Sequence, residues 1–256
     1  MNPANCDDAE LAAYLAAEAG RLLLAVRETS GLTGKALGKE GDAAANRYLC
    51  DNIRRFRPDD GLLSEEEKDN PDRLAKRRVW IVDPVDGTRE YSEGRSDWAV
   101  HVALSIDGVA TVGAVALPGL EGGIVLRSDR PQALPAMAAP PRFVVSRTRP
   151  AKEAQAVAEA LGGELVAMGS AGAKAMAVVR GEAEVYLHSG GQYEWDNCAP
   201  VAVAAAHGLH CSRINGEQFF YNRLHTYLED VLICRRELAT LVLEQLSVLR
   251  GGANVP

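Results

Sequence analysis

The sequence has little that would mark a secreted, membrane-spanning or nucleic-acid-binding protein. Its five cysteines are odd in number and scattered, and none forms a C-x-x-C pair, so we expect reduced, mostly buried thiols in a cytoplasmic protein. There is no run of about 18 apolar residues, so no membrane span is expected. The acidic, amphipathic start lacks the basic-then-apolar pattern of a secretory signal. The net charge of −7 argues against nucleic acid polymers, which need a basic face.

A small anionic substrate stays compatible with this charge, because bound metal ions can reverse the local sign. With 256 residues, 47% of them hydrophobic, the chain can build one large domain or two lobes of about 120 residues each. The Pro- and Ala-rich stretch 129–141 is the best candidate for a linker. We therefore predict an α+β lobe over 1–140 and an α/β lobe over 141–256.

The spacing of hydrophobic residues predicts the helices and strands of the first lobe. A first helix is expected from a cap at Asp7 or Asp8, then a glycine-rich break at 31–41 and a second helix over 42–56. The strands expected there are 79–82, 99–106, 109–117 and 122–127, with Asp107-Gly108 closing a hairpin.

In the second lobe, short apolar segments alternate with helical patterns, which predicts an α/β layer with a largely parallel sheet. The expected strands are 143–146, 165–168, 184–188 and 231–234, and the expected helices are 151–161, 171–180, 196–207 and 237–249.

Three acidic clusters stand at the ends of apolar segments. They are Ser64-Glu65-Glu66-Glu67, Asp83-Pro84-Val85-Asp86-Gly87-Thr88 and Glu194-Trp195-Asp196. Taken singly, a surface charge run, a solvated turn and a helix N-cap would explain them. Together, they predict carboxylates at a sheet edge that converge on a cleft, where protons or cations must neutralise them.

The middle cluster has the residue types of a metal and phosphate site. Mg²⁺ prefers hard oxygen ligands and keeps room for water and phosphate oxygens. The proline between Asp83 and Asp86 fixes the backbone, so that the Val85 carbonyl can join them as a ligand. Gly87 permits close backbone approach, and Thr88 is expected to begin a helical turn whose N–H groups favour phosphate.

The order SEEE, DPVDGTREY and EWDNCAP resembles the triple signature of the inositol monophosphatase superfamily of Mg²⁺-dependent, lithium-sensitive phosphatases. The resemblance runs from about Leu11 to about Leu249 and implies a layered αβαβα sugar-phosphatase fold. DGTREY is similar to the form found in CysQ-type 3′(2′),5′-bisphosphate nucleotidases. GSAGAKAMAV (169–178) and YLHSGGQYEWD (186–196) are most similar to mycobacterial members of that group, which act on 3′-phosphoadenosine 5′-phosphate.

Carried over by position, the resemblance implies the roles of the site residues. Two or three Mg²⁺ ions would be held by Glu65, Asp83, the Val85 carbonyl, Asp86 and Asp196, with Glu66 just outside. The catalytic residues would be Asp42, Glu65 and Thr88, with Thr88 and Asp42 positioning and deprotonating the attacking water. The substrate-binding residues would be Asp86, Gly87, Thr88, Gly169, Ser170, Lys174, His188 and Asp196.

The implied reaction is in-line hydrolysis of the 3′-phosphate of 3′-phosphoadenosine 5′-phosphate, and also of 3′-phosphoadenylyl sulfate, in sulfate assimilation. Li⁺ and excess Ca²⁺ are the expected inhibitors. Relatives suggest a homodimer, although no surface stripe in the sequence establishes one. An inositol 1-phosphate or fructose 1,6-bisphosphate phosphatase of the same fold is the alternative.

Several single residues have two interpretations. Many nucleotidases carry arginine at the position of His188, and a neutral histidine cannot grip phosphate in the same way, so His188 is either a weaker contact or a strand-end residue. Lys174 is either a substrate contact or a solvated lysine. Arg89 and Glu90 could be an ordinary helix-start pair. We interpret His101 as a packed sheet histidine.

Overall fold

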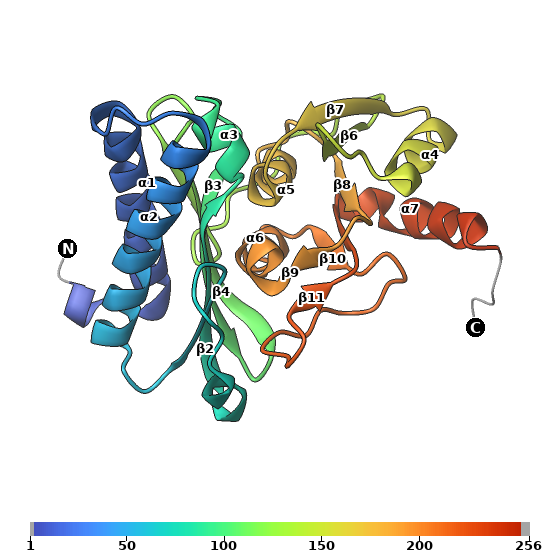
Figure 1. Cartoon of the computed structure of the whole chain (residues 1–256). Helices are drawn as coiled ribbons and strands as arrows, with labels where there is room; N and C mark the ends of the chain where they lie inside the picture. The colour runs from blue at the N-terminus through green and yellow to red at the C-terminus, as the bar shows by residue number, and fades with distance from the viewer. Residues whose placement is uncertain (1–2, 252–256) are drawn as a thin grey trace.

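A computed structural model describes residues 3–251, which form five layers (Figure 1). From left to right in that view, the layers are the helix pair α1–α2, a first sheet, the pair α5–α6, a second sheet, and the pair α4–α7. The helices are α1 (Asp8–Thr29), α2 (Gly34–Phe56), α3 (Thr88–Ser92), α4 (Lys152–Ala160), α5 (Ala171–Val179), α6 (Glu194–Ala206) and α7 (Arg236–Leu249). This layering confirms the predicted αβαβα fold.

The first sheet has the strand order β1-β2-β3-β4-β5. Its strands are β1 (Gly61–Ser64), β2 (Arg78–Asp86), β3 (Ala99–Ile106), β4 (Val109–Leu117) and β5 (Ile124–Arg127). β1 runs parallel to β2 and the others are antiparallel, including the β3–β4 hairpin that Asp107-Gly108 was predicted to close. β2 is buried from Val79 to Asp86, because α2 covers one face of this sheet and α6 the other.

The second sheet has the order β10-β12-β8-β6-β7. Its strands are β6 (Arg142–Ser146), β7 (Glu164–Met168), β8 (Val185–His188), β10 (His210–Ser212) and β12 (Val231–Cys234), and a separate pair joins β9 (Gln192–Tyr193) to β11 (Tyr227–Leu228). β6, β7 and β8 are parallel, whereas β12 pairs antiparallel with both β8 and β10. β10 therefore runs in the direction of β8, and the prediction of a largely parallel sheet holds except for β12, which is reversed because periodicity locates strands but does not fix their direction.

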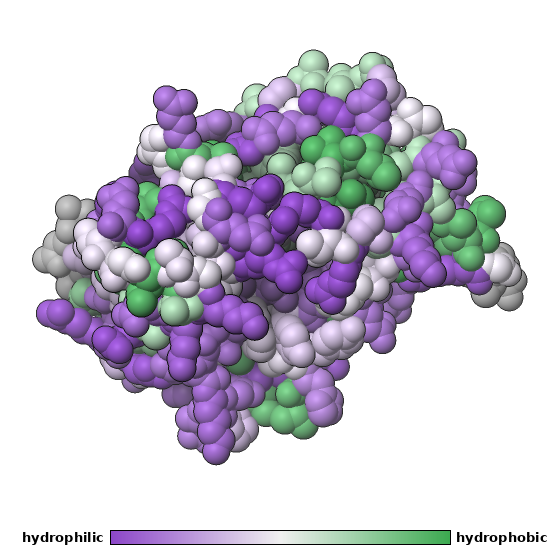
Figure 2. Space-filling view, turned by 45° about the horizontal axis from the view of Figure 1, so that its top comes forward, coloured by the Kyte–Doolittle hydropathy of each residue, from purple (hydrophilic) through white to green (hydrophobic). Residues whose placement is uncertain are grey.

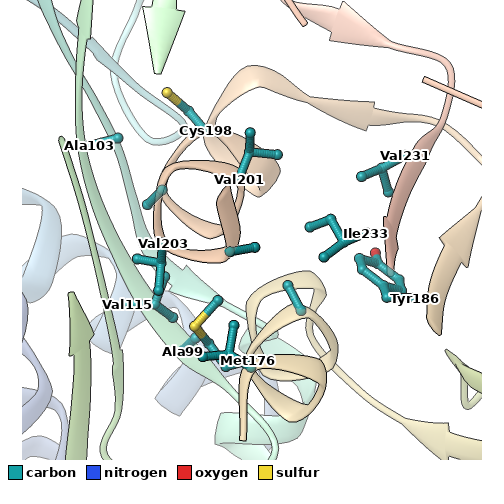
Figure 3. Packing of buried hydrophobic residues seen from close by; sticks show 14 of the residues in the cluster. Ala99, Ala103, Val115, Met176, Tyr186, Cys198, Val201, Val203, Val231 and Ile233 are labelled. Atoms are coloured by element: carbon teal, nitrogen blue, oxygen red, sulfur yellow. The ribbon is translucent and has the colours of Figure 1, made fainter. Parts of the chain in front are cut away.

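The middle helices hold the two sheets together (Figure 3). Met176 of α5 and Val203 of α6 pack in one buried cluster with Val115 of the first sheet and Ile233 of the second. Residues 129–141 contain no helix or strand and join the two sheets, while the division into two lobes stays a prediction. The face seen in Figure 2 is largely hydrophilic, with hydrophobic residues in small separate groups.

The first two helices show one success and one error of the sequence patterns. Asp7 caps α1, since its carboxylate accepts a hydrogen bond of 2.8 Å from the Glu10 amide, and the Glu10 side chain returns to the Asp7 amide. The expected break at 31–41 is confirmed only for residues 31–33, because α2 already begins at Gly34. A Cβ on Gly38 would come within 2.8 Å of Thr88, and one on Gly41 within 2.6 Å of Tyr91. These glycines allow α2 to pack closely on α3 and do not end a helix.

Within residues 3–251, no helix combines the length and apolarity needed to span a bilayer. Cys50, Cys198 and Cys234 are buried free thiols and Cys211 is a partly buried one, in agreement with the expected cysteine chemistry.

Candidate active site and metal centre

Three carboxylates from distant parts of the chain meet at the junction of the layers. Asp83 and Asp86 lie at the end of β2, and Asp196 lies in the first turn of α6. One oxygen of each lies within 4.8 Å of the others. The predicted turn is in fact the end of β2, where the pairing with β3 shifts between Asp83 and Asp86. This irregularity is a β-bulge, a feature that often redirects side chains near active sites.

Asp83 is the innermost of these acids, with 1% of its surface exposed. Its Oδ1 accepts a hydrogen bond of 3.0 Å from the Val85 amide, whereas its buried Oδ2 has no hydrogen-bond partner among residues 3–251. Burial, followed by the charges of Glu65, Asp86 and Asp196, raises the pKa of Asp83 well above its usual value. An unpartnered buried carboxylate oxygen is unfavourable unless a proton or a cation reaches it.

Asp86, unlike Asp83, is kept ionised, and the start of α5 contributes to this. The Ser170 hydroxyl donates to its carboxylate, and so do the amides of Ala171 at 3.1 Å and Gly172 at 2.6 Å. Burial alone would raise the pKa of Asp86, but His101, followed by the hydrogen bonds from Ser170 and Gly172, lowers it to about 2. Asp86 is therefore a fixed negative charge within the cluster.

His101 lies in β3, where it is fully buried, as predicted for a packed sheet histidine. Its Nε2 is 3.2 Å from Asp86 Oδ2, and its Nδ1 is 2.9 Å from the Trp195 carbonyl oxygen. Burial tends to lower the pKa of His101, but the Asp86 carboxylate raises it above the usual value. The sequence analysis did not predict the contact between His101 and Asp86. Because α3 lies between β2 and β3, no tight turn in the sequence fixes which residues of these two strands face each other.

Glu65 and Glu66 follow β1 directly. β1 runs parallel to β2, with Ser64 opposite Val82. The residues that follow these two, Glu65 and Asp83, therefore lie close together. Desolvation, followed by the charge of Asp196, raises the pKa of Glu65 to about 7. Glu66 lies close to Asp42 instead, and its charge contributes to the raised pKa of that residue.

Thr88 and Asp42 form the pair that the resemblance implied. The Thr88 hydroxyl lies 3.2 Å from Asp42 Oδ1 and 3.1 Å from the Val85 carbonyl oxygen, and it can donate to either. Burial, followed by the charge of Glu66, raises the pKa of Asp42 to about 7. Thr88 begins α3, as predicted, and Gly87 before it has φ +91°, a left-handed conformation that favours glycine.

A cavity of about 680 Å³ opens beside the acids. Eight predicted site residues line it: Glu65, Asp86, Gly87, Gly169, Ser170, Lys174, His188 and Asp196. Asp42, Asp83, Val85 and Thr88 are not in its wall. Sequence reasoning missed several lining residues: Ser146, Arg147, Thr148, Arg149, Tyr186, Gln192 and Tyr193. Most of these follow or end a parallel strand, the edge where α/β sheets bind ligands, and that position was the available signal.

Lys174 and His188 also line this cavity. Lys174 is 5% exposed, so it is not a solvated lysine, and its Nζ donates to the carbonyl oxygens of Gly169, at 3.2 Å, and Ser170. Burial lowers the pKa of Lys174 to about 8. Burial, and then the charge of Lys174, lower the pKa of His188 to about 4, so His188 is neutral at pH 7.

The Arg89–Glu90 pair is not the ordinary helix-start pair that the sequence allowed. Glu90 is buried and accepts a hydrogen bond of 2.6 Å from Arg147, which follows β6 of the other sheet. Arg89 is exposed at the cavity. Trp195 stacks on Tyr193 with ring centroids 4.8 Å apart.

The donor set suits a hard divalent cation. It offers several carboxylates close together, and in the described part of the chain a buried oxygen of Asp83 has no hydrogen-bond partner. Oxygen ligands of this kind are those of Mg²⁺ and Ca²⁺, whereas Zn²⁺ sites are built mostly from nitrogen and sulfur. The cluster is therefore a candidate site for a divalent cation at the junction of the layers.

The pattern that defines the inositol monophosphatase family matches residues 7–248. The chain belongs to this family.

Named relatives extend the comparison. The chain is 48% identical to a 3′-phosphoadenosine 5′-phosphate phosphatase of Mycobacterium leprae, over 94% of this chain and 93% of the relative. It is 30% identical to the 3′(2′),5′-bisphosphate nucleotidase CysQ of Escherichia coli, over 73% of this chain and 80% of that protein. The crystal structure of CysQ from Bacteroides thetaiotaomicron matches with a TM-score of 0.73 at 23% identity, covering 88% of this chain and 96% of that one.

Proposed function

We propose that this chain is a Mg²⁺-dependent 3′(2′),5′-bisphosphate nucleotidase that removes the 3′-phosphate of 3′-phosphoadenosine 5′-phosphate. The observation that carries the proposal is a cavity lined both by the carboxylates Glu65, Asp86 and Asp196 and by the exposed guanidinium groups of Arg89 and Arg149. A bisphosphate can place one phosphate at the acidic cluster and its metal and the other at a guanidinium, whereas inositol 1-phosphate has only one phosphate to place. The similarity to the mycobacterial phosphatase, over almost the full length of both chains, supports the same substrate.

The metal would be held by Glu65, Asp83, Asp86, Asp196 and the carbonyl oxygen of Val85. Bound Mg²⁺ supplies positive charge to the phosphoryl oxygens and lowers the pKa of a ligated water. The amides of Gly87 and Thr88 are proposed to bind the phosphate beside it.

Asp42 and Thr88 are proposed to move the proton of the attacking water. A water that donates to Thr88 Oγ1 can pass its proton there, while the hydroxyl proton of Thr88 moves to Asp42 Oδ1, 3.2 Å away. A pKa of about 7 suits Asp42 as a general base near neutral pH. The hydroxide attacks phosphorus, and the ribose 3′-oxygen leaves with the electron pair of the broken P–O bond and takes a proton from solvent, to which Asp42 later returns the proton that it accepted.

The test is phosphate release from 3′-phosphoadenosine 5′-phosphate, inositol 1-phosphate and fructose 1,6-bisphosphate, measured side by side with Mg²⁺. The proposal expects kcat/KM to favour the nucleotide at least about 100-fold, which is about 2.7 kcal/mol of transition-state discrimination. Equal rates, or a preference for inositol 1-phosphate or fructose 1,6-bisphosphate, would contradict the nucleotide assignment.

The cellular role proposed from this substrate is to clear 3′-phosphoadenosine 5′-phosphate in sulfate assimilation, with hydrolysis of 3′-phosphoadenylyl sulfate as a second activity. Inhibition by Li⁺ and by excess Ca²⁺ belongs to the same proposal. A Li⁺ titration at fixed Mg²⁺ tests it, and full activity at tens of millimolar Li⁺ would count against it. The homodimer stays a prediction.

A further inference from the structure

The loop after β6 lies over the end of β8. These strands are parallel, with Val144 opposite Tyr186, so Ser146 and His188, two residues further along, end side by side. The Ser146 hydroxyl oxygen accepts a hydrogen bond of 3.2 Å from the Arg149 amide. This bond turns the loop back, and Arg149 lines the same cavity as His188.

Arg147 and Arg149 differ in what their guanidinium groups contact. Arg147 donates to Glu90 at 2.6 Å and to Glu93 at 3.0 Å, so its charge is already neutralised. Within residues 3–251, the exposed guanidinium of Arg149 has no hydrogen-bond or ion-pair partner. It therefore offers all its donors to a ligand.

The other two basic side chains at this end of the cavity are less suited to bind an anion. Lys174 is buried, and its ammonium group already donates to two backbone carbonyls. His188 is neutral at pH 7, since burial and the charges of Lys174 and Arg149 hold its pKa near 4. Next to His188, Arg149 is the side chain that combines a permanent charge with unused donors; Arg89, which lines the cavity from α3, is the other exposed guanidinium.

We propose that Arg149 binds the 5′-phosphate of the substrate and so makes the enzyme selective for bisphosphates. The proposal rests on the proposed function, because the 3′-phosphate is taken to lie at the acidic cluster. The second phosphate then points away from those carboxylates, toward the ends of β6 and β8. Arg149 supplies there a guanidinium that is unpaired among the described residues and can grip two phosphate oxygens at once.

The experiment compares two substrates that differ only in the 5′-phosphate, namely 3′-phosphoadenosine 5′-phosphate and adenosine 3′-monophosphate. Loss of one charge-assisted contact typically reduces transition-state binding by about 10- to 100-fold. Arg149→Ala should therefore lower kcat/KM for the bisphosphate by that factor and change the monophosphate rate less than about threefold. Arg149→Lys should restore part of the loss, because it keeps the charge but not the fork.

Arg89→Ala is the matched comparison, because Arg89 lines the same cavity and is also exposed. It should change both substrates by the same factor, as expected for a general loss of positive charge. If Arg149→Ala also acts equally on both substrates, Arg149 contributes only general charge and the proposal is wrong.

Binding of adenosine 5′-monophosphate separates this inference from the proposed function. The wild type should bind it at least about tenfold more tightly than Arg149→Ala does, with adenosine bound equally by both. If the wild type shows this difference in binding but does not hydrolyse 3′-phosphoadenosine 5′-phosphate, the proposed function is wrong and Arg149 remains a phosphate site. If the wild type hydrolyses 3′-phosphoadenosine 5′-phosphate but Arg149→Ala binds adenosine 5′-monophosphate as tightly as the wild type, the proposed function stands and the inference about Arg149 is wrong.

Discussion

Asp83→Asn gives a direct test of the acidic cluster, because it removes one negative charge and keeps the shape. Asn can still accept the hydrogen bond from the Val85 amide, which is 3.0 Å long in the structure. At 4.8 Å, the largest separation between the cluster's ligand atoms, two carboxylates repel by about 3 kcal/mol at an effective dielectric of about 20. Without metal, the folded state is destabilised either by this repulsion or by the free-energy cost of protonating one of the acids.

Asp83→Asn should therefore melt no lower than the wild type in a chelator. Because the folded state raises the pKa of Asp83, keeping it ionised costs stability above the unfolded pKa of about 4. The advantage of the variant should grow as the pH rises, to as much as about 10 °C in Tm. The assay is thermal unfolding between pH 5 and pH 8, in chelator and then in saturating Mg²⁺.

In saturating Mg²⁺, the order of the two melting temperatures should reverse. Mg²⁺ stabilises whichever fold binds it, so the wild type should gain in Tm much more than Asp83→Asn, whose turnover should be at least 100-fold lower. Asp107→Asn is the control, because it makes the same change at an exposed acid paired with Arg77. A variant that melts below the wild type in chelator, that gains equally from Mg²⁺, or that keeps turnover within tenfold would refute the metal assignment.

Three further predictions concern the surroundings of the site. Gly172→Ala should destabilise the fold by about 1–3 kcal/mol in urea unfolding, because the new Cβ would lie 2.0 Å from His101 Nε2; no loss would show that the two elements move apart freely. Thr88→Val should reduce kcat by about 10²- to 10⁴-fold, while Thr88→Ser, which keeps the hydroxyl, should stay near wild type; equal rates for both would exclude the proton path. The guanidinium of Arg142 and two backbone amides hold the pKa of buried Glu184 below its usual value, although burial alone would raise it. Glu184→Gln should therefore cost stability at pH 7, and the difference from wild type should shrink as the pH falls below about 4.5; a constant difference would contradict this.

Local sequence signals predicted the parts of the fold that depend on neighbouring residues. The Asp7 cap of α1 and the Asp107-Gly108 hairpin follow from contacts within a few positions, and the structure agrees with both. Gly38 shows the limit of such signals. A glycine looks the same in sequence whether it ends a helix or makes room for Thr88 from another helix.

In the candidate site, too, some features follow from local sequence and others depend on how the strands pair. The acidic residues could be named from their motifs, but the position of Glu65 beside Asp83 depends on a parallel pairing of β1 with β2 that no local pattern specifies. The contact of His101 with Asp86 depends on the register of β2 with β3, and the place of Arg149 beside His188 depends on that of β6 with β8. Neither register is fixed by a tight turn between the two strands. Side chains joined by such pairings become visible only when the sheets are assembled.

Asp86, near the end of β2, takes its hydrogen bonds from the start of α5, on the far side of the 129–141 segment. The same segment separates Asp97 from Gly169, whose amide donates to that carboxylate at 2.6 Å, and Glu90 from Arg147. If the chain were cut in this segment, the first fragment would keep Asp86 without its donors. The second would keep those donors without the acid. Each fragment alone would be inert, and recovery of phosphatase activity on mixing would report reassembly of the two halves.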